Sequence, residues 1–129
     1  MPTLFSKIIA GEIPCHKVAE NDDFIAFLDI DPVAPGHTLV VPKIEVDYIF
    51  DLDEKYLSGI NLFARSVAAK LQQTVPCKRI GIAVIGLEVP HAHMHLVPLN
   101  RVGDINFAGG RVKMSQEELA SLAEKIRLA

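Results

Sequence analysis

The segment 91–97, HAHMHLV, places three histidines at every second position and puts an apolar residue after each of them. Side chains alternate between the two faces of a β-strand, so this spacing predicts a strand with His91, His93 and His95 on one face. The intervening apolar residues then face a hydrophobic core. A strand with two such different faces requires a sheet that is covered by packing on one side and carries chemistry on the other.

The rest of the chain predicts further strands around this one. Apolar runs bounded by turn residues predict strands over residues 16–20, 24–30, 38–42, 79–87 and 91–99. Residues 16–20 and 24–30 are separated by the turn-like Asn-Asp-Asp and are expected to form a hairpin. Pro42 is expected to end the third strand, because proline cannot donate to a sheet ladder.

Capping residues mark the predicted helices. A short helix is expected to follow Thr3 and to stop at Gly11. Asp51 and Glu54 have capping-box spacing and open a long amphipathic stretch that runs to Pro76. Ser115 and Glu118 open a second capped helix at the C-terminus. Runs of strands combined with packed helices predict an α+β fold with an antiparallel sheet of about five strands.

Composition restricts the class of protein. The 129 residues fit one domain, and the net charge of −3 without a cluster of Lys and Arg argues against nucleic acid as a partner. No segment approaches the ~20 apolar residues of a membrane span. Cys15 and Cys77 stand alone, which favours free thiols over a disulfide and predicts a cytoplasmic protein.

Two kinds of chemistry fit a row of imidazoles. Neutral imidazoles bind zinc and copper, and such a site would recruit Glu88 or His37 as a further ligand. A neutral imidazole is also a good nucleophile toward phosphorus, with a pKa near operating pH. No Ser, Cys or Lys stands beside the row to serve as nucleophile instead. From the residues alone, both possibilities stay open.

Three blocks in order, FSKIIAGEIP, FLDIDPVAPGHTLVVPK and HAHMHLV, resemble the histidine triad (HIT) family. The resemblance runs from about residue 3 to residue 98. It implies a nucleotide hydrolase or phosphoramidase that cleaves at the α-phosphorus and releases a nucleoside monophosphate. Dinucleoside polyphosphate hydrolysis and nucleotidyl transfer are alternatives within the same family. A non-catalytic nucleotide-binding protein and an HxHxH metal-binding protein are alternatives of other classes.

The resemblance also implies roles for four histidines. His93 corresponds to the nucleophile that forms a nucleotidyl-histidine. His95 would donate to the phosphate, and His91 would support the row. His37 matches the family's fourth histidine, which lies beside the triad in space. No metal is implied for the covalent step, although Mg²⁺ would accompany a polyphosphate substrate.

Nucleotide-binding residues follow from the same comparison. Asp29 matches the acid that accepts hydrogen bonds from the ribose hydroxyls. The apolar slot for a purine base matches Phe5, Ile8, Phe27, Leu28 and Ile30. The family commonly forms twofold dimers through the long helix and a neighbouring strand, so a homodimer is expected, with a purine nucleotide as the small-molecule partner.

The sequence departs from the family at three places: Glu88, the connection GLEVPH, which is shorter than in other members, and the positions of a structural zinc site. Glu88 replaces the Ser or Thr that contacts phosphate, so it is expected either to point away or to alter substrate choice, and the Val89 N–H is left as a phosphate donor. Thr3, Ser6 and Glu45 stand where many bacterial relatives carry the cysteines and histidine of a structural zinc site. Structural zinc is therefore not expected.

Overall fold

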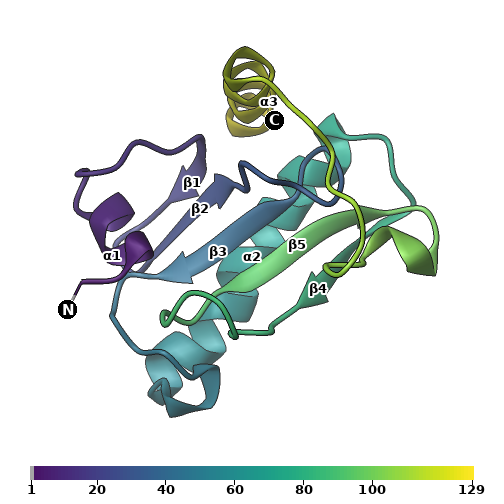
Figure 1. Cartoon of the computed structure of the whole chain (residues 1–129). Helices are drawn as coiled ribbons and strands as arrows, with labels where there is room; N and C mark the ends of the chain where they lie inside the picture. Colours follow the sequence, from purple (N-terminus) through teal and green to yellow (C-terminus); the bar gives the residue numbers. More distant parts are fainter. Residues whose placement is uncertain (1) are drawn as a thin grey trace.

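A five-stranded antiparallel sheet lies at the centre of the structure, a computed structural model that describes residues 2–129 (Figure 1). The spatial order is β1-β2-β3-β5-β4. The strands are β1 (Lys17–Glu20), β2 (Phe24–Leu28), β3 (Thr38–Pro42), β4 (Arg79–Ala83) and β5 (Met94–Leu99). β1 and β2 form the expected hairpin. This architecture confirms the predicted α+β fold.

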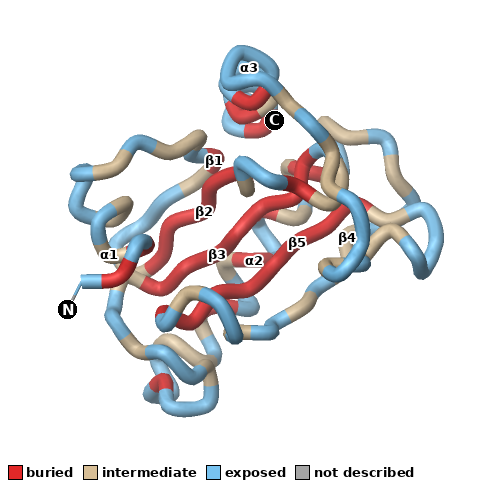
Figure 2. Tube along the Cα trace, viewed as in Figure 1, coloured by how far each residue is buried: buried red, intermediate tan, exposed pale blue. Residues whose placement is uncertain are grey.

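Two helices cover one face of the sheet. The helix α2 (Glu54–Thr74) runs behind the strands in Figure 1, and α3 (Gln116–Leu128) packs beside it. Alternate strand residues such as Phe24, Ala26 and Val40 meet the apolar stripes of both helices in one buried cluster. The red strands in Figure 2 mark this burial, and each fully buried large apolar side chain contributes about 1.5–3 kcal/mol.

The opposite face of the sheet carries a smaller apolar cluster. Ile25, Phe27, Leu39 and Val41, which alternate with the residues of the first cluster, pack here against Phe5. Phe5 lies on the short helix α1 (Leu4–Ile9). This second face therefore has an apolar patch at the α1 side and leaves the β5 side available for polar residues.

The structure confirms the predicted N-cap residues of α1 and α3, but the N-cap of α2 differs from the predicted one. Thr3 caps α1 by accepting from the Ser6 N–H, and Gly11 follows the helix with a φ of 80°. Ser115 opens α3 with the expected capping box. The prediction for α2 was wrong by two residues, because the side chain of Asp53 accepts from the Tyr56 N–H.

Asp51 instead ends a 3₁₀ turn, η1 (Ile49–Asp51). Its own N–H bonds to the Tyr48 carbonyl, so it lies inside a turn that precedes α2. Leu52 is buried just after this turn. Anchoring of that side chain sets where α2 begins.

The strand predicted over residues 91–99 begins later, at Met94, and β4 is shorter than the predicted 79–87. The reason lies in the neighbouring strand β3, which pairs with β5 only from Val40↔Met94 to Thr38↔Leu96. Beyond Val41 comes Pro42, which has no N–H to continue the ladder. The N–H of Ala92 bonds instead to the carbonyl of Val46, in the loop after β3.

A second 3₁₀ turn, η2 (Val102–Asp104), follows β5 and leads into the segment 105–115 before α3.

Among the helices of residues 2–129, none combines the length and apolar character that crossing a membrane requires.

Candidate active site

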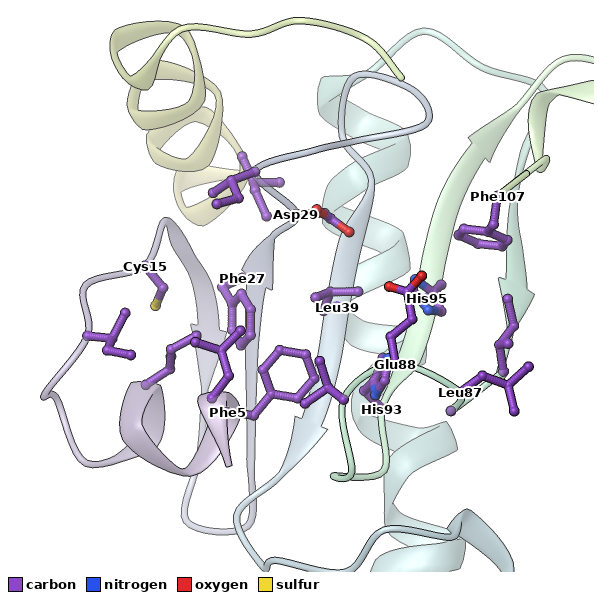
Figure 3. Close-up of a pocket in the computed structure, with 18 of the residues that line it drawn as sticks. Phe5, Cys15, Phe27, Asp29, Leu39, Leu87, Glu88, His93, His95 and Phe107 are labelled. Atoms are coloured by element: carbon purple, nitrogen blue, oxygen red, sulfur yellow. The ribbon is translucent and has the colours of Figure 1, made fainter. Parts of the chain in front are cut away.

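A cavity of about 380 Å³ lies on the face of the sheet that carries the smaller cluster (Figure 3). Predicted site residues form half of its wall: Phe5, Ile8, Phe27, Leu28, Asp29, Ile30, Glu88, Val89, His93 and His95. His37 and His91 are not part of this wall. They lie fully buried behind it, with 0% and 1% of their surfaces exposed. The fold thus brings together residues that are separated by up to 90 positions in the chain.

One end of the cavity is apolar. The rings of Phe5 and Phe27 meet edge to face with centroids 5.7 Å apart, and Leu39 lies beside them (Figure 3). Ile8 packs against the same cluster. Leu28 also borders the cavity, but its side chain belongs to the core beneath the helices, because alternate residues of a strand face opposite sides.

His93 lies next to this apolar end, with its ring 5.0 Å from that of Phe5. Its Nδ1 is 2.7 Å from the backbone carbonyl of His91. A carbonyl only accepts, so Nδ1 carries the proton and donates it. The Nε2 atom of neutral His93 is therefore unprotonated and has a free lone pair, as a nucleophilic imidazole requires.

The tautomer of His95 is set by a chain of donors that begins in the loop after β2. The Val33 N–H donates to Nδ1 of His37 over 3.1 Å, so the neutral His37 ring carries its proton on Nε2. Nε2 of His37 then donates to Nδ1 of His95 over 2.9 Å. The remaining proton of His95 is on Nε2. His95 thus offers an N–H donor where His93 offers a lone pair.

Burial keeps both of these rings neutral. It lowers the pKa of His37 to about 3, and the charges of His95 and Arg111 act in the same direction. Burial likewise lowers the pKa of His95 to about 4, assisted by His93 and Arg111. At neutral pH both rings are therefore neutral, and the hydrogen bonds from Val33 to His37 and from His37 to His95 form without an additional proton.

His91 points away from the cavity. Its Nε2–H donates to the Pro42 carbonyl over 2.9 Å, and its Nδ1 lies 2.9 Å from the hydroxyl of Thr3. Both ring nitrogens are thereby used within the protein. His91 meets the cavity only through its backbone carbonyl, which binds His93.

Asp29 lies just past the end of β2. One carboxylate oxygen accepts the Asp31 N–H over 2.8 Å, and the other lies 3.7 Å from Nε2 of His37. Burial raises the pKa of this carboxyl, while the Asp31 amide and the charge of Arg111 oppose the rise. The carboxylate borders the cavity between the apolar end and His95, where it is available to hydroxyl donors (Figure 3).

Asp29, His37 and His95 also offer a donor set for a metal ion, since one ligand atom of each lies within 4.8 Å of the others. A carboxylate with two imidazoles suits zinc. A metal ion between His37 and His95 would have to displace the proton that these rings share. His91 has no free nitrogen for a metal, so the arrangement does not assemble an ion site from the HxHxH row itself.

Glu88 is exposed and also lines the cavity. It follows Gly86, whose φ of 72° allows the tight turn after β4, and its side chain extends toward the histidines in Figure 3. The carboxylate of Glu88 therefore lines the same cavity as His93 and His95. Val89 packs into the apolar cluster, and its carbonyl accepts the His91 N–H over 2.8 Å.

Half of the wall residues were absent from the predicted site, and Phe107 and Arg111 are the two of them that lie on the His95 side. Phe107 packs against the ring of His95 with centroids 4.6 Å apart and against that of His37 at 5.6 Å. Arg111 bonds to the carbonyls of Asp31 and Phe107 and also lines the cavity. An aromatic residue in a glycine-containing loop was the only local signal, and it gives no position in space.

The chain is similar in sequence to known proteins. The HIT domain family model matches residues 10–102. An uncharacterized HIT-like protein from Mycoplasma genitalium is 38% identical over 105 residues, which is 78% of this chain and 74% of that protein. An adenosine 5′-monophosphoramidase from Schizosaccharomyces pombe is 30% identical over 128 residues, covering 98% of this chain and 96% of the enzyme.

Solved structures agree with the sequence matches. A crystal structure of a Hit-like protein from Bartonella henselae superimposes with a TM-score of 0.84 and 31% identity, over 98% of this chain and 95% of that one. Sheet order, histidine row and sequence blocks therefore lead to the same conclusion: the chain belongs to the histidine triad (HIT) family.

Proposed function

We propose that the protein hydrolyses nucleotides at the α-phosphorus, as a phosphoramidase, with His93 as the nucleophile. One observation carries the proposal: the His91 carbonyl fixes the proton of His93 on Nδ1, at 2.7 Å, and leaves Nε2 free beside the cavity. The S. pombe relative with adenosine 5′-monophosphoramidase activity supports the substrate class.

The two steps follow from the tautomers. Nε2 of His93 forms a bond to phosphorus, and the bond from phosphorus to the leaving group breaks. The leaving amine receives a proton from solvent. The Nε2–H of His95 donates a hydrogen bond to a phosphate oxygen and stabilises the developing charge. Water then attacks phosphorus, the N–P electron pair returns to Nε2, and a nucleoside monophosphate and a solvent proton are released.

The cavity offers a separate site for the base and for the ribose of the nucleotide. The apolar end formed by Phe5, Phe27 and Leu39 suits a purine held by stacking and burial. The Asp29 carboxylate accepts hydrogen bonds from the ribose hydroxyls. Glu88 then lies on the phosphate side, where its charge disfavours extra negative charge on the leaving group. This favours phosphoramidates with an uncharged amine over polyphosphates, for which Mg²⁺ would be the natural partner.

We also propose a cytoplasmic homodimer. Apolar side chains on β4 and on α2 stay exposed in the single chain, Ile82 at 57% and Leu62 at 60%. A second copy would cover this surface. The two cysteines are free, as a reducing compartment allows. Size-exclusion chromatography with light scattering tests the dimer, and a monomer at micromolar concentration contradicts it.

The decisive experiment traps the intermediate. The protein is mixed with adenosine 5′-monophosphoramidate, quenched within one turnover and digested, and the peptide containing residue 93 is examined by mass spectrometry. We expect an adenylylated His93. His93→Ala should remove the adduct and turnover. His16→Ala is the matched control, because His16 lies at the surface and bonds Gln116.

The alternatives give different results. Nucleotide binding without an adduct, over a panel of phosphoramidates and polyphosphates, would make the protein a nucleotide-binding module in which Glu88 has abolished the chemistry. A purified protein with near-stoichiometric zinc, lost in His37→Ala, would favour a metal site at Asp29, His37 and His95.

A further inference from the structure

A hydrogen-bonded path connects the exposed surface to the buried side of the histidine row. It begins at Glu45, in the loop after β3, and its Oε1 accepts the Ser6 hydroxyl over 2.5 Å and the Thr3 N–H over 3.1 Å. The hydroxyls of Ser6 and Thr3 lie 3.0 Å apart. The Thr3 hydroxyl lies 2.9 Å from Nδ1 of His91. An acidic side chain at the surface is thus connected to the triad through Ser6 and Thr3.

Proton directions along this path are fixed at both ends. The carboxylate of Glu45 only accepts, so Ser6 donates to it, and this bond lowers the pKa of Glu45. At the other end the Nε2–H of His91 is committed to the Pro42 carbonyl, so Nδ1 accepts from the Thr3 hydroxyl. Both hydroxyl hydrogens are therefore used, and none is shared between Ser6 and Thr3. Glu45 holds Thr3 through the Thr3 N–H, and the Ser6 N–H donates to the Thr3 hydroxyl oxygen over 3.0 Å.

His91 passes this restraint to His93. The peptide carbonyl of His91 receives the Nδ1–H of His93, and the ring of Phe5 lies against both imidazoles, at 5.9 and 5.0 Å. Rotation of the His91 ring would disturb the peptide that selects the reactive tautomer of His93. The backbone next to His91 is held separately, by the bond from Ala92 N–H to the Val46 carbonyl.

We propose that Glu45 is a positioning residue for the nucleophile, acting through Ser6, Thr3 and His91 on the orientation and tautomer of His93. This inference rests on the proposed function for its kinetic readout. Glu45 does not touch the cavity and takes no part in proton transfer. It holds Ser6 and Thr3 in place, and the Thr3 hydroxyl orients one imidazole.

The inference differs from a purely structural role of Glu45 in holding α1. Loosening of α1 would disturb the apolar slot and raise KM for the nucleotide, with little change in kcat. Loss of the His93 orientation would lower kcat, because the lone pair no longer meets phosphorus in line. The split between KM and kcat therefore separates the two roles.

The kinetic test compares two substitutions at one position. Glu45→Gln retains an oxygen that accepts from Ser6 and from the Thr3 N–H, whereas Glu45→Ala removes the acceptor. We expect kcat to fall about tenfold in the Ala variant and less than about threefold in the Gln variant, with KM within about threefold of the wild type. Glu124→Ala, on the exposed face of α3, is the control. An unchanged kcat in Glu45→Ala overturns the proposal.

A double-mutant cycle tests the route. Thr3→Val keeps the shape of Thr3 and removes the hydroxyl that donates to His91. If Glu45 acts along the path, Glu45→Ala should lower kcat by less than about twofold in the Thr3→Val background. If the double variant instead loses the product of the two single losses, Glu45 acts independently of Thr3 and the proposed route is wrong.

A measurement without substrate keeps this inference separate from the proposed function. Nitrogen-15 NMR of the histidine rings reports which nitrogen of His93 carries the proton. We expect the Nδ1–H form in the wild type and in Glu45→Gln, and a mixture of tautomers in Glu45→Ala. Identical ring spectra in all three refute the positioning role. A protein without turnover whose His93 tautomer still depends on Glu45 refutes only the proposed function.

Discussion

Lowering the pH from 7 to 5 protonates a histidine of ordinary pKa, but it should leave His37 neutral in the native protein. The ring is completely buried, and burial lowers its pKa from the usual 6.5 to about 3. The unfolded chain therefore binds a proton in this range that the native chain does not. The stability due to this neutral ring is present above pH 6.5 and is lost progressively as the pH falls toward 3.

The magnitude follows from the two pKa values. A difference of one pKa unit corresponds to about 1.4 kcal/mol, and between pH 7 and pH 5 an unfolded histidine with a pKa of 6.5 gains about three quarters of a proton. His37 should therefore lower the free energy of unfolding by about 2 kcal/mol over this range. His95, with a pKa of about 4, adds a similar loss, so the pair accounts for about 4 kcal/mol.

Urea unfolding at pH 7, 6 and 5 measures this loss, and His37→Gln isolates the contribution of His37. Glutamine retains an amide that donates toward Nδ1 of His95 and does not titrate. Between pH 7 and pH 5, the free energy of unfolding of the His37→Gln variant should fall by about 2 kcal/mol less than that of the wild type. Equal pH dependence in the two proteins would show that His37 does not stay neutral through burial. His16→Gln, at the surface, is the control.

Three further predictions concern charge, ribose recognition and packing. Glu88→Gln removes a negative charge beside the bound phosphate, so KM for an adenosine phosphoramidate should fall about tenfold in steady-state assays, and an unchanged KM would place the carboxylate away from phosphate. Asp29→Asn should weaken binding of AMP in calorimetry by more than that of its 2′,3′-dideoxy analogue, and equal losses would exclude ribose recognition. Leu71→Ala, at a fully buried position of α2, should lower the free energy of unfolding by about 2–5 kcal/mol in urea titrations, and a loss below about 1 kcal/mol would indicate that the core closes over the gap.

Local patterns predicted the elements well where the signal repeats within a few residues. Apolar runs bounded by turn residues, FIAFL and TLVVP, predicted β2 and β3, and the pair Ser115 and Glu118 predicted the start of α3. These signals depend on the composition of short segments and on hydrogen bonds between near neighbours. The start of α2 was misplaced because Asp51 and Asp53 are both suitable caps, and a tertiary contact, the burial of Leu52, selected the second.

The sequence predicted half of the residues that line the cavity, but not the strand pairing that brings them together. HAHMHLV places three imidazoles on one face of an extended segment, and the family resemblance supplies the partner His37. Pairing of β3 with β5 then brings Leu39 opposite His95 and the ring of His37 within 2.9 Å of His95. No local pattern encodes that register.

By itself, the sequence determined the α+β class, the caps of two helices and the row of histidines, because short-range periodicity and hydrogen bonding dictate them. The tertiary structure alone decided that His91 faces inward, that Phe107 covers His95, and that Glu45 connects to the triad. Each of these depends on segments far apart in the chain. Their meeting is set by how the sheet and helices pack as a whole, and that packing also gives three similar imidazoles three different environments.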